Sequence, residues 1–360
     1  MRIAIHLTPA KRSHERDLFT SLDDVELVFV GGDDDEASPD IALPVRRVPW
    51  LGSRDRWSAA LAWLGGTRSV DIEADVLIAQ EAYSVGSAQM AAMAQRLGAP
   101  LVVLVAEILE RYPLYRLPPW RFFTNRVRNA DAHFICLTDL ARRHLIALGF
   151  DPDAITVVAP GVDTELFTPS ATARPADRSV AFVGELRPDK GILDLVEAGD
   201  ILAAQDRPIL LRVVGQGPLE ADLRERANDR PWLELAGRLP RDVVAERLRD
   251  CAAFCLPSKG RTMWAEQFGF ALVEAMASGV PVVSTDCGAI PEVVPPWNAL
   301  VTQGDPTALA AALDEAVGPA ADDWGPRNRA WAESHFDLQT QSRLLHDTLE
   351  RILTVERSNG

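Results

Sequence analysis

The chain has 360 residues, of which 47% are hydrophobic and 25% charged, and its net charge at pH 7 is −15. This length exceeds the size at which one hydrophobic core keeps growing, so we expect two domains, and the negative charge argues against a nucleic-acid partner, which needs clustered cations. No run approaches about 18 consecutive apolar residues, and the N-terminal "MRIAIHLTPAKRSH" lacks the features of a signal peptide, so we expect a cytoplasmic protein.

Short β-rich runs alternate with longer helical patterns in the first half of the chain. Several of the short runs are apolar on both faces, which is typical of a parallel sheet covered by helices on each side. One helical stretch, "TDLARRHLIALG", ends at Gly149, a residue type that commonly closes helices. The pattern predicts a βαβ series with strands at 2–7, 25–32, 75–81, 100–107, 132–138 and 154–161.

The same pattern restarts after a polar, Pro- and Ala-rich stretch at 168–179, which we interpret as a linker. Strands are predicted at 180–186, 209–217, 232–239, 252–258, 280–286 and 298–303. We therefore predict an α/β protein in which two doubly wound, Rossmann-like domains, 1–167 and 180–335, face a central cleft. A C-terminal helix at 336–360 is expected to pack back on the N-terminal domain. Such sheets bind ligands at the carboxyl ends of their strands.

The four cysteines do not form a recognisable metal motif. Cys251 and Cys255 have helical i, i+4 spacing, but no second pair and no His partner completes a zinc site. We expect no metal site, and we interpret Cys136, Cys251, Cys255 and Cys287 as small buried hydrophobic residues in a reducing compartment.

Two glutamates interrupt the otherwise apolar stretch "EQFGFALVEAMASGVPVV" at 266–283. We expect a helix from Phe268 to Ala277, closed by Gly279, with Glu274 in its middle. A buried, unpaired carboxylate costs several kcal/mol, so a face open to a polar ligand is favoured. Eight helical residues place Glu266 and Glu274 ~12 Å apart, too far for the ~5–9.5 Å of a glycosidase pair. The two side chains would therefore hold two ends of one long ligand.

The start of this helix, around Phe268 and Gly269, offers backbone N–H groups and a positive dipole end that suit a phosphate. A sugar, a phosphate and a ribose would then follow one another along the segment. In the alternative interpretation, Glu266 caps the helix and Glu274 is structural, paired with an Arg that the sequence does not identify.

The sequence "EQFGFALVEAMASGVPVVSTDCGAIPEVV" resembles the E-x7-E signature of the family-4 retaining glycosyltransferases, which have the GT-B fold. The stretches "VGELRPDKG", "VVGQGPLEADL", "LAGRLP", "FCLPS" and "VVAPGVDTELFTP" also follow the order and approximate spacing of that family. The resemblance is strong from about residue 155 to about residue 300 and weaker in the first half. It is specific for fold and reaction class but not for substrate.

The resemblance implies that Glu274 accepts the ribose hydroxyls of a nucleotide sugar and that Glu266 contacts the hydroxyls of the sugar ring. It also implies that the amides of Phe268 and Gly269, together with Lys190, hold the diphosphate. Lys190 is one of only three lysines in the chain.

By the same resemblance, Gly237, Arg238 and Leu239 would line the base pocket. The family commonly has Arg directly after the Gly of its phosphate loop, but this chain has Glu185 there. A glutamate facing a diphosphate would repel it, so we expect Glu185 to point away and Arg187 to supply the cation.

Retaining transfer needs the charge of the leaving group stabilised and the acceptor positioned, which Arg187, Lys190 and the helix start could do without a metal. Members of the family usually place a His after the fourth strand, where this chain has Glu107. Glu107 either takes that role or is an ordinary loop glutamate. Lys259 is either a surface lysine or a phosphate or acceptor ligand, and His6 either lines the cleft or is structural.

Residues 111–130, "RYPLYRLPPWRFFTNRVRNA", carry five arginines and five aromatic residues and no acidic residue. Residues 50–68 add three tryptophans and three arginines. Basic and aromatic residues together suit an anionic membrane surface or a lipid-phosphate acceptor, which would make the protein peripheral on the inner face of the membrane. The alternative is that the rings lie in the core and the arginines cover acidic neighbours.

The leading hypothesis is a hexosyltransferase-type retaining glycosyltransferase that needs no cofactor and uses a nucleotide-diphosphate sugar as co-substrate. Its acceptor would be the hydroxyl of a glycan or lipid-linked molecule, in glycolipid, polysaccharide or cell-surface glycan synthesis. The first alternative is a non-catalytic GT-B-like binding or scaffold subunit. An NAD-dependent oxidoreductase is a weaker alternative, because "VVGQGPLEADL" lacks the third Gly of the dinucleotide fingerprint.

Overall fold

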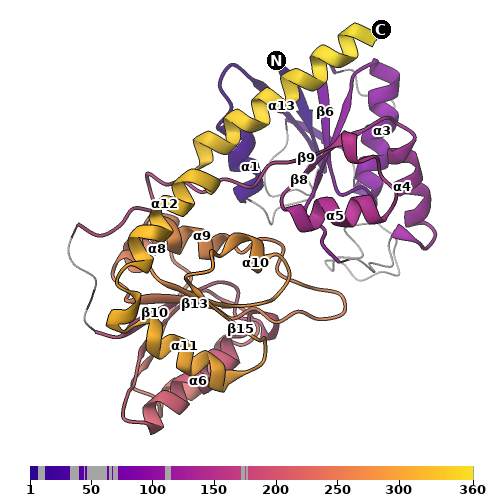
Figure 1. Ribbon diagram of the computed structural model, residues 1–360. Coiled ribbons are helices and arrows are strands. Elements are labelled where there is room, and N and C mark those ends of the chain that lie inside the picture. The colour runs from indigo at the N-terminus through magenta and orange to yellow at the C-terminus, as the bar shows by residue number, and fades with distance from the viewer. Residues whose placement is uncertain are drawn as a thin grey trace. The chain divides into compact units, whose positions relative to one another are not determined.

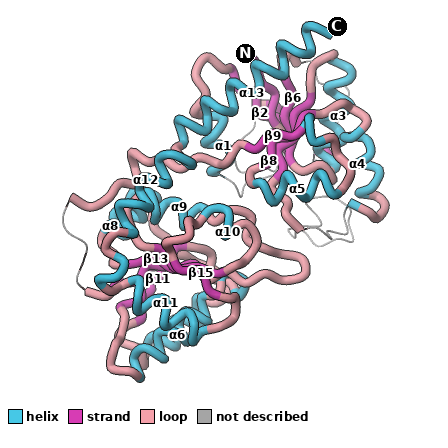
Figure 2. Tube along the Cα trace, in the orientation of Figure 1, coloured by secondary structure: helices cyan, strands magenta, loops and turns pink. Residues whose placement is uncertain are grey.

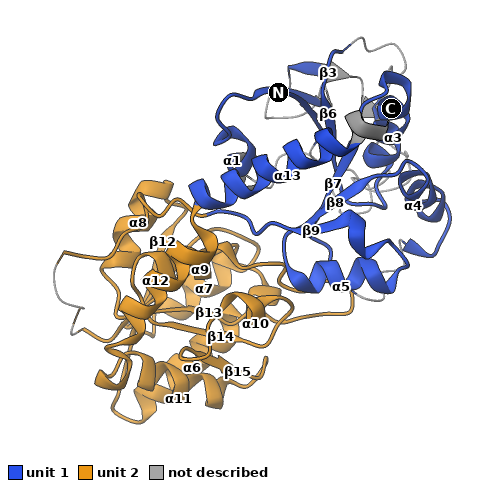
Figure 3. Ribbon diagram, turned by 45° about the horizontal axis from the view of Figure 1, so that its top comes forward, with its two compact units in different colours: residues 1–161, 338–360 blue, residues 162–337 orange. Residues whose placement is uncertain are grey.

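The computed structural model of the chain describes residues 1–6, 13–32, 40–43, 45–46, 63–64, 67, 72–109, 115–171, 175 and 177–359. The chain divides into two compact units (Figure 3). Unit 1 consists of Met1–Gly161 and Leu338–Gly360, and unit 2 consists of Val162–Asp337. Unit 1 is therefore made from two separate segments of the sequence, and unit 2 from one.

The chain passes from unit 1 to unit 2 between Gly161 and Val162, which is before the stretch predicted as a linker. Residues 162–179, which include the stretch predicted as a linker, belong to unit 2. The reason is a set of contacts with the end of that unit: the amide of Val162 donates to the carbonyl of Phe336, and the hydroxyl of Thr164 donates to Asp337 at 2.6 Å. Arg329 also donates to backbone carbonyls in this segment.

Unit 1 is built on a seven-stranded parallel sheet with the order β3-β2-β1-β6-β7-β8-β9. Its strands are β1 (Arg2–Ile5), β2 (Glu26–Gly32), β3 (Ile41–Leu43), β6 (Val76–Gln80), β7 (Leu101–Val105), β8 (His133–Cys136) and β9 (Ile155–Val157). All six predicted strands are present. The prediction missed β3 and the antiparallel pair β4 (Val45–Arg46) and β5 (Trp63–Leu64), each of which has only two or three residues.

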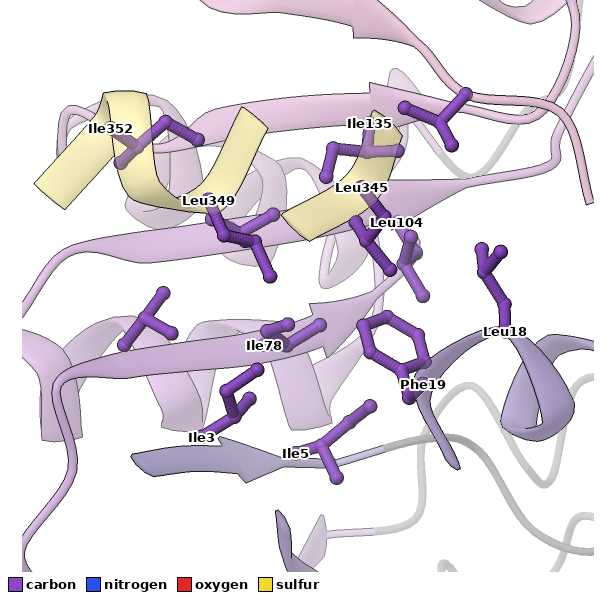
Figure 4. Packing of buried hydrophobic residues seen from close by; sticks show 13 residues of the cluster. Ile3, Ile5, Leu18, Phe19, Ile78, Leu104, Ile135, Leu345, Leu349 and Ile352 are labelled. Carbon is purple, nitrogen blue, oxygen red and sulfur yellow. The ribbon is translucent and has the colours of Figure 1, made fainter. Parts of the chain in front are cut away.

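The helices of unit 1 are α1 (Ser13–Thr20), α3 (Val85–Leu97), α4 (Trp120–Arg128), α5 (Asp139–Ala147) and α13 (Leu338–Asn359). One face of the sheet packs against α13, whose side chains Leu345, Leu349 and Ile352 lie over the strands (Figure 4). Their i, i+4, i+7 spacing places them on one side of the helix. On the sheet they meet Ile78 and Leu104, so the C-terminal helix completes the core of unit 1.

Unit 2 has a six-stranded parallel sheet with the order β12-β11-β10-β13-β14-β15. Its strands are β10 (Ser179–Val183), β11 (Leu210–Val214), β12 (Leu233–Gly237), β13 (Ala253–Leu256), β14 (Val282–Thr285) and β15 (Ala299–Val301). The strand order reverses between β10 and β13, and the loops after these two strands therefore start side by side. Doubly wound sheets bind ligands at such a point.

The helices of unit 2 are α6 (Ile192–Ala204), α7 (Glu220–Ala227), α8 (Arg241–Arg249), α9 (Phe270–Ala277), α10 (Ile290–Val293), α11 (Pro306–Ala316) and α12 (Trp324–Phe336). Helices α6 and α11 cover one face of the sheet, and α8, α9 and α12 cover the other (Figure 1). Figure 2 shows the strands of each unit as a central layer between helices. Both units are thus doubly wound and Rossmann-like, as the alternating pattern predicts.

Candidate functional site

The loop after β10 and the loop after β13 are packed tightly together. The first contains the short 3₁₀ turn Pro188–Lys190 and then Gly191, which has φ +70°. A Cβ atom at Gly191 would overlap the backbone carbonyl oxygen of Pro257, in the second loop. Only glycine combines this backbone conformation with this approach, so Gly191 fixes how Lys190 meets the end of β13.

Lys190 and Glu266 form the centre of the site. The Nζ atom of Lys190 lies 2.6 Å from Oε2 of Glu266, and the hydroxyl of Ser258 donates to the same oxygen at 2.7 Å. Glu266 is buried, and its own carbonyl accepts from the amide of Ala289 at 2.9 Å. The Lys190 ammonium also lies 5.0 Å from the centre of the Trp264 ring, within the range of a cation–π contact. The carboxylate and the cation are therefore held in one fixed arrangement.

Arg187 is already engaged by carboxylates. Its guanidinium makes two hydrogen bonds to buried Asp189, at 2.9 and 2.8 Å, and lies 3.4 Å from Glu185. Burial lowers the pKa of Arg187, but its hydrogen bonds and attraction to Asp189 and Glu185 outweigh this and leave the pKa raised. Glu185 therefore lies beside Arg187. The guanidinium of Arg187, which was expected to face a diphosphate, is already paired with Glu185 and Asp189.

Helix α9 begins at Phe270, two residues later than predicted, because Gly269 before it has the left-handed conformation, with φ +84°. No side chain caps this helix start. Phe268 precedes the helix, and its buried ring packs edge-on against Phe270 and Phe336. The estimate of ~12 Å between Glu266 and Glu274 assumed a continuous helix, and the late start of α9 removes its basis.

Glu274 lies within α9 and is buried, as the sequence predicts. Its Oε1 atom is 3.6 Å from Nε of Arg241, the first residue of α8. Arg241 also lies over the ring of Phe167, with 5.4 Å between the guanidinium carbon and the ring centre. Arg241 is therefore the arginine expected in the alternative interpretation, in which Glu274 has a structural role. The ion pair offsets part of the cost of burying the carboxylate.

The expected base-binding segment leads directly to this arginine. Gly237 ends β12 with φ +70°, and its carbonyl accepts from the amide of Gly215 at 2.8 Å. Arg238 is exposed and Leu239 is half-buried. The segment 237–239 and Glu274 are linked through Arg241, three residues from Arg238 along the chain.

Lys259, for which two roles were open, pairs with Asp194 of α6 at 2.9 Å. Its amide donates to the carbonyl of Asp189 at 2.8 Å. These contacts give Lys259 a structural role in joining the two loops. In unit 1, His6 is likewise held inside the fold, because its Nδ1 atom lies 2.8 Å from the carbonyl oxygen of Val30 and its ring lies against Gly86.

Glu107 follows the end of β7 in unit 1 and is almost fully buried. One of its carboxylate oxygens accepts from the amides of Ile108 and Leu109, both at 3.0 Å. Glu81, at the end of the neighbouring strand β6, has φ 62° and accepts from the amide of Ala106 at 3.1 Å. Two carboxylates therefore cap the carboxyl ends of adjacent strands.

Two parts of the chain match models of known protein families. A family model described as "Glycosyl transferases group 1" matches residues 177–318, and one described as "Glycosyl transferase 4-like domain" matches residues 11–161. Together they cover most of the chain. Both matches are to glycosyltransferase models, and the chain belongs to the glycosyltransferases. The family resemblance seen in the sequence is confirmed.

Curated relatives of this chain also carry glycosyltransferase names. A phosphatidyl-myo-inositol mannosyltransferase of Mycolicibacterium smegmatis is 35% identical over 197 residues, which are 52% of this chain and 48% of that protein. The amylovoran biosynthesis glycosyltransferase AmsK of Erwinia amylovora is 31% identical over 229 residues, or 60% of this chain and 55% of that protein. The chain spans about half the length of the curated relatives it matches.

Two solved structures match nearly the whole length of the chain. HepE of Anabaena, crystallised with UDP, has a TM-score of 0.75 and 19% identity, covering 98% of this chain and 100% of that one. Sucrose-phosphate synthase from Thermosynechococcus elongatus has a TM-score of 0.73 and 17% identity, covering 99% and 100%. The fold of this glycosyltransferase is therefore GT-B, as predicted.

Sequence reasoning missed three residues of unit 2 that contact the predicted site residues: Ser258 bonds to Glu266, Asp189 to Arg187, and Arg241 pairs with Glu274. In unit 1 it missed Glu81, which accepts from the amide of Ala106, next to Glu107 in the chain. Ser258 had a usable signal, since it ends the predicted strand 252–258 at the carboxyl edge of the sheet.

The four cysteines of this glycosyltransferase are unpaired and buried. Burial raises the pKa of Cys287 to about 11 and raises the pKa of the other three. A thiol with a raised pKa stays protonated at pH 8, and the thiolate is the reactive form. We therefore expect an aromatic disulfide reagent at pH 8 to label the native protein very slowly and to label four thiols after unfolding in guanidinium. Rapid labelling of the native protein would contradict the buried positions.

The described residues contain neither a cluster of metal ligands nor a membrane-spanning helix. No group of three or more His, Cys, Asp or Glu side chains in this part of the glycosyltransferase could hold a metal ion. No helix among the same residues is long and apolar enough to cross a membrane.

Proposed function

We propose that this chain transfers a hexosyl group from a nucleotide-diphosphate sugar to a hydroxyl acceptor with retention of anomeric configuration. One observation carries the proposal: Glu266 is held by Lys190 and Ser258 in the loops after β10 and β13, where the strand order of unit 2 reverses. This is where a doubly wound sheet binds its ligand. In this proposal Glu266 contacts the sugar hydroxyls and Glu274 the ribose.

The leaving diphosphate needs positive charge as its bond to the sugar breaks. Lys190 has an ammonium beside Glu266, and the start of α9 lacks a side-chain cap. The amides of Phe268 and Gly269 approach the phosphates in this proposal, while Arg187 contributes through the charge it shares with Asp189. We infer that these groups replace a metal ion and that no cofactor is required.

The acceptor is proposed to be the hydroxyl of a glycan or lipid-linked molecule, in glycolipid, polysaccharide or cell-surface glycan synthesis. Support comes from two relatives, one named for amylovoran biosynthesis and the other for phosphatidyl-myo-inositol. In unit 1, Glu107 is proposed to contact the donor or the leaving proton. We also propose peripheral attachment to an anionic membrane through 111–130, of which the structure describes 115–130.

A nucleotide panel tests the donor proposal. We expect one nucleoside diphosphate among UDP, GDP and ADP to raise the melting temperature, because a ligand at 100 times its Kd stabilises the folded state by about 2.7 kcal/mol. The matching nucleotide sugar should be consumed at the same rate with and without EDTA. The product examined by NMR should keep the anomeric configuration of the donor.

Each outcome of this panel has a separate meaning. NAD is added to the panel, and stabilisation by NAD alone would contradict the donor proposal. No response to any of the four compounds would favour the non-catalytic scaffold. Loss of turnover in EDTA would refute metal independence only. An inverted product would refute retention only.

A further inference from the structure

A polar cavity of about 340 Å³ lies in unit 1, between α4 and the end of α5. Its lining residues include three arginines, Arg116, Arg121 and Arg128, and the polar residues Thr124 and Asn125. Figure 3 shows both helices within unit 1. The residues proposed to hold the sugar, the ribose and the diphosphate of the donor belong to unit 2, and the cavity lining does not include Glu107 of unit 1.

The arginines of this cavity have no acidic neighbours in their own segment. Residues 111–130 contain no Asp or Glu, although the chain as a whole has a net charge of −15. Arg116 and Arg121 are exposed and form no ion pair with any residue that the structure describes. On the neighbouring helix, by contrast, Arg142 and Arg143 both pair with Asp139. The cavity therefore concentrates positive charge that no ion pair among the described residues neutralises at Arg116 and Arg121.

One of the three guanidinium groups is fixed in place. Arg128 donates to the carbonyl of Leu148 at 3.0 Å and lies over the ring of Phe150, with 4.7 Å to the ring centre. A guanidinium held rigidly loses less freedom when it binds an anion, and its planar fork suits the oxygens of a phosphate. Asn125 accepts from Arg128 at 3.5 Å, so its side chain is oriented by the same group.

Two large apolar residues that are neighbours in sequence of the cavity arginines are exposed. Leu117 and Phe122 are 52% and 69% exposed, and each directly follows an arginine of the cavity lining, Arg116 or Arg121. Large exposed apolar groups beside cations are typical of surfaces that bind anionic lipid, because the rings and aliphatic groups enter the acyl region while the cations meet the headgroups. A site for a free phosphate would gain nothing from these two side chains.

We propose that this cavity binds the phosphate group of an anionic lipid, with Arg116, Arg121 and Arg128 on the phosphate oxygens and Leu117 and Phe122 beside the acyl chains. This inference sharpens the membrane attachment proposed above and rests on that part of the proposed function alone. The membrane attachment through residues 111–130 would then include specific binding of one headgroup phosphate in this cavity, in addition to general electrostatic attraction.

Co-sedimentation of the full chain with vesicles tests the site. The vesicles contain phosphatidylcholine alone or phosphatidylcholine with phosphatidic acid. Arg126 provides a matched control, because it is exposed on the same helix as Arg121 and does not line the cavity. We expect Arg121→Gln to weaken binding to the phosphatidic acid vesicles by about 10-fold or more, the effect of losing a hydrogen bond to a charged group. Arg126→Gln should weaken it by about 5-fold or less, the effect of one surface charge.

Two further measurements identify the source of the phosphate. Phe122→Ala should weaken vesicle binding and leave the weak competition by soluble glycerol 3-phosphate unchanged. If glycerol 3-phosphate competes fully at low concentration and Phe122→Ala costs nothing, the site takes a free phosphate and the lipid proposal is overturned.

The remaining outcomes separate this inference from the proposed activity. If Arg121→Gln and Arg126→Gln weakened vesicle binding equally, the cavity would not be a specific phosphate site. The attraction would then be a general effect of positive surface charge. Absence of wild-type binding to anionic vesicles would overturn both the site and the membrane attachment. In every variant, nucleoside diphosphate binding should stay at the wild-type value, since that site lies in unit 2. If the wild-type protein bound no nucleoside diphosphate, that result would count against the donor proposal and not against the lipid site.

Discussion

Replacement of Lys190 by Ala is expected to lower kcat/KM for glycosyl transfer by about 10²- to 10³-fold, the usual cost of removing one group that stabilises developing negative charge. Lys190 lies 2.6 Å from Glu266, and its loop is fixed against Pro257 by Gly191. The variant loses the cation proposed for the diphosphate and leaves Glu266 without its charged partner. Initial rates with the nucleotide sugar selected by the panel measure the effect.

The matched control is Lys259→Ala. Lys259 lies in the loop after β13 but pairs with Asp194, so its removal should leave kcat/KM close to the wild-type value. Equal losses in the two lysine variants would show that Lys190 acts only through the packing of the loops.

A double variant separates stability from chemistry. Leaving one member of a buried ion pair unpaired costs about 3–5 kcal/mol, and the partial exposure of Lys190 places this pair towards the lower end. Lys190→Met combined with Glu266→Gln removes both charges and should recover most of the lost melting temperature. Turnover should stay low. Recovery of turnover together with stability would refute a direct role for the pair.

Replacement of Glu274 by Gln is expected to raise the Kd of the nucleoside diphosphate by about 10- to 100-fold, because a hydrogen bond to a charged group contributes roughly 1.5–3 kcal/mol. The amide keeps the shape of the side chain in α9 but loses the negative charge. Isothermal titration with the nucleoside diphosphate measures the change without requiring turnover.

Arg241→Gln is the control for Glu274. If Glu274 only balances Arg241, both variants should lower the melting temperature and neither should change nucleotide affinity. If Glu274 binds ribose, Glu274→Gln should lose much more affinity than Arg241→Gln. Unchanged affinity in Glu274→Gln would exclude the ribose role.

The fold was largely predictable because each strand carries its own signal. Runs such as "PLVVLVAE" are apolar on both faces, and that local pattern identifies a buried parallel strand wherever it occurs. Strands of two or three residues, such as β4 (Val45–Arg46), have too few positions to show a period. The start of α9 was placed two residues early because apolar residues continue through Phe268, and only the left-handed backbone of Gly269 marks the boundary.

The partners in the site could not be predicted in the same way. The sequence singles out Glu266, Glu274 and Lys190, but Lys190 is 76 residues from Glu266, and nothing local indicates that the two side chains meet. Arg241 and Asp194 belong to ordinary amphipathic helices, where charged residues usually face water. Their pairing with Glu274 and Lys259 follows from how the chain folds and not from any periodic pattern.

The divided sequence of unit 1 has a consequence for synthesis on the ribosome. Leu345, Leu349 and Ile352 complete the core over the first sheet, yet they are translated after all of unit 2. Domains generally form as their residues emerge. Residues 162–337 can therefore reach their final structure first, while the earlier-made strands lack the cover of α13. Until α13 is made, Leu18 and Phe19 of α1 are the only helical residues of this cluster that cover Ile78 and Leu104, and α13 then completes the cover.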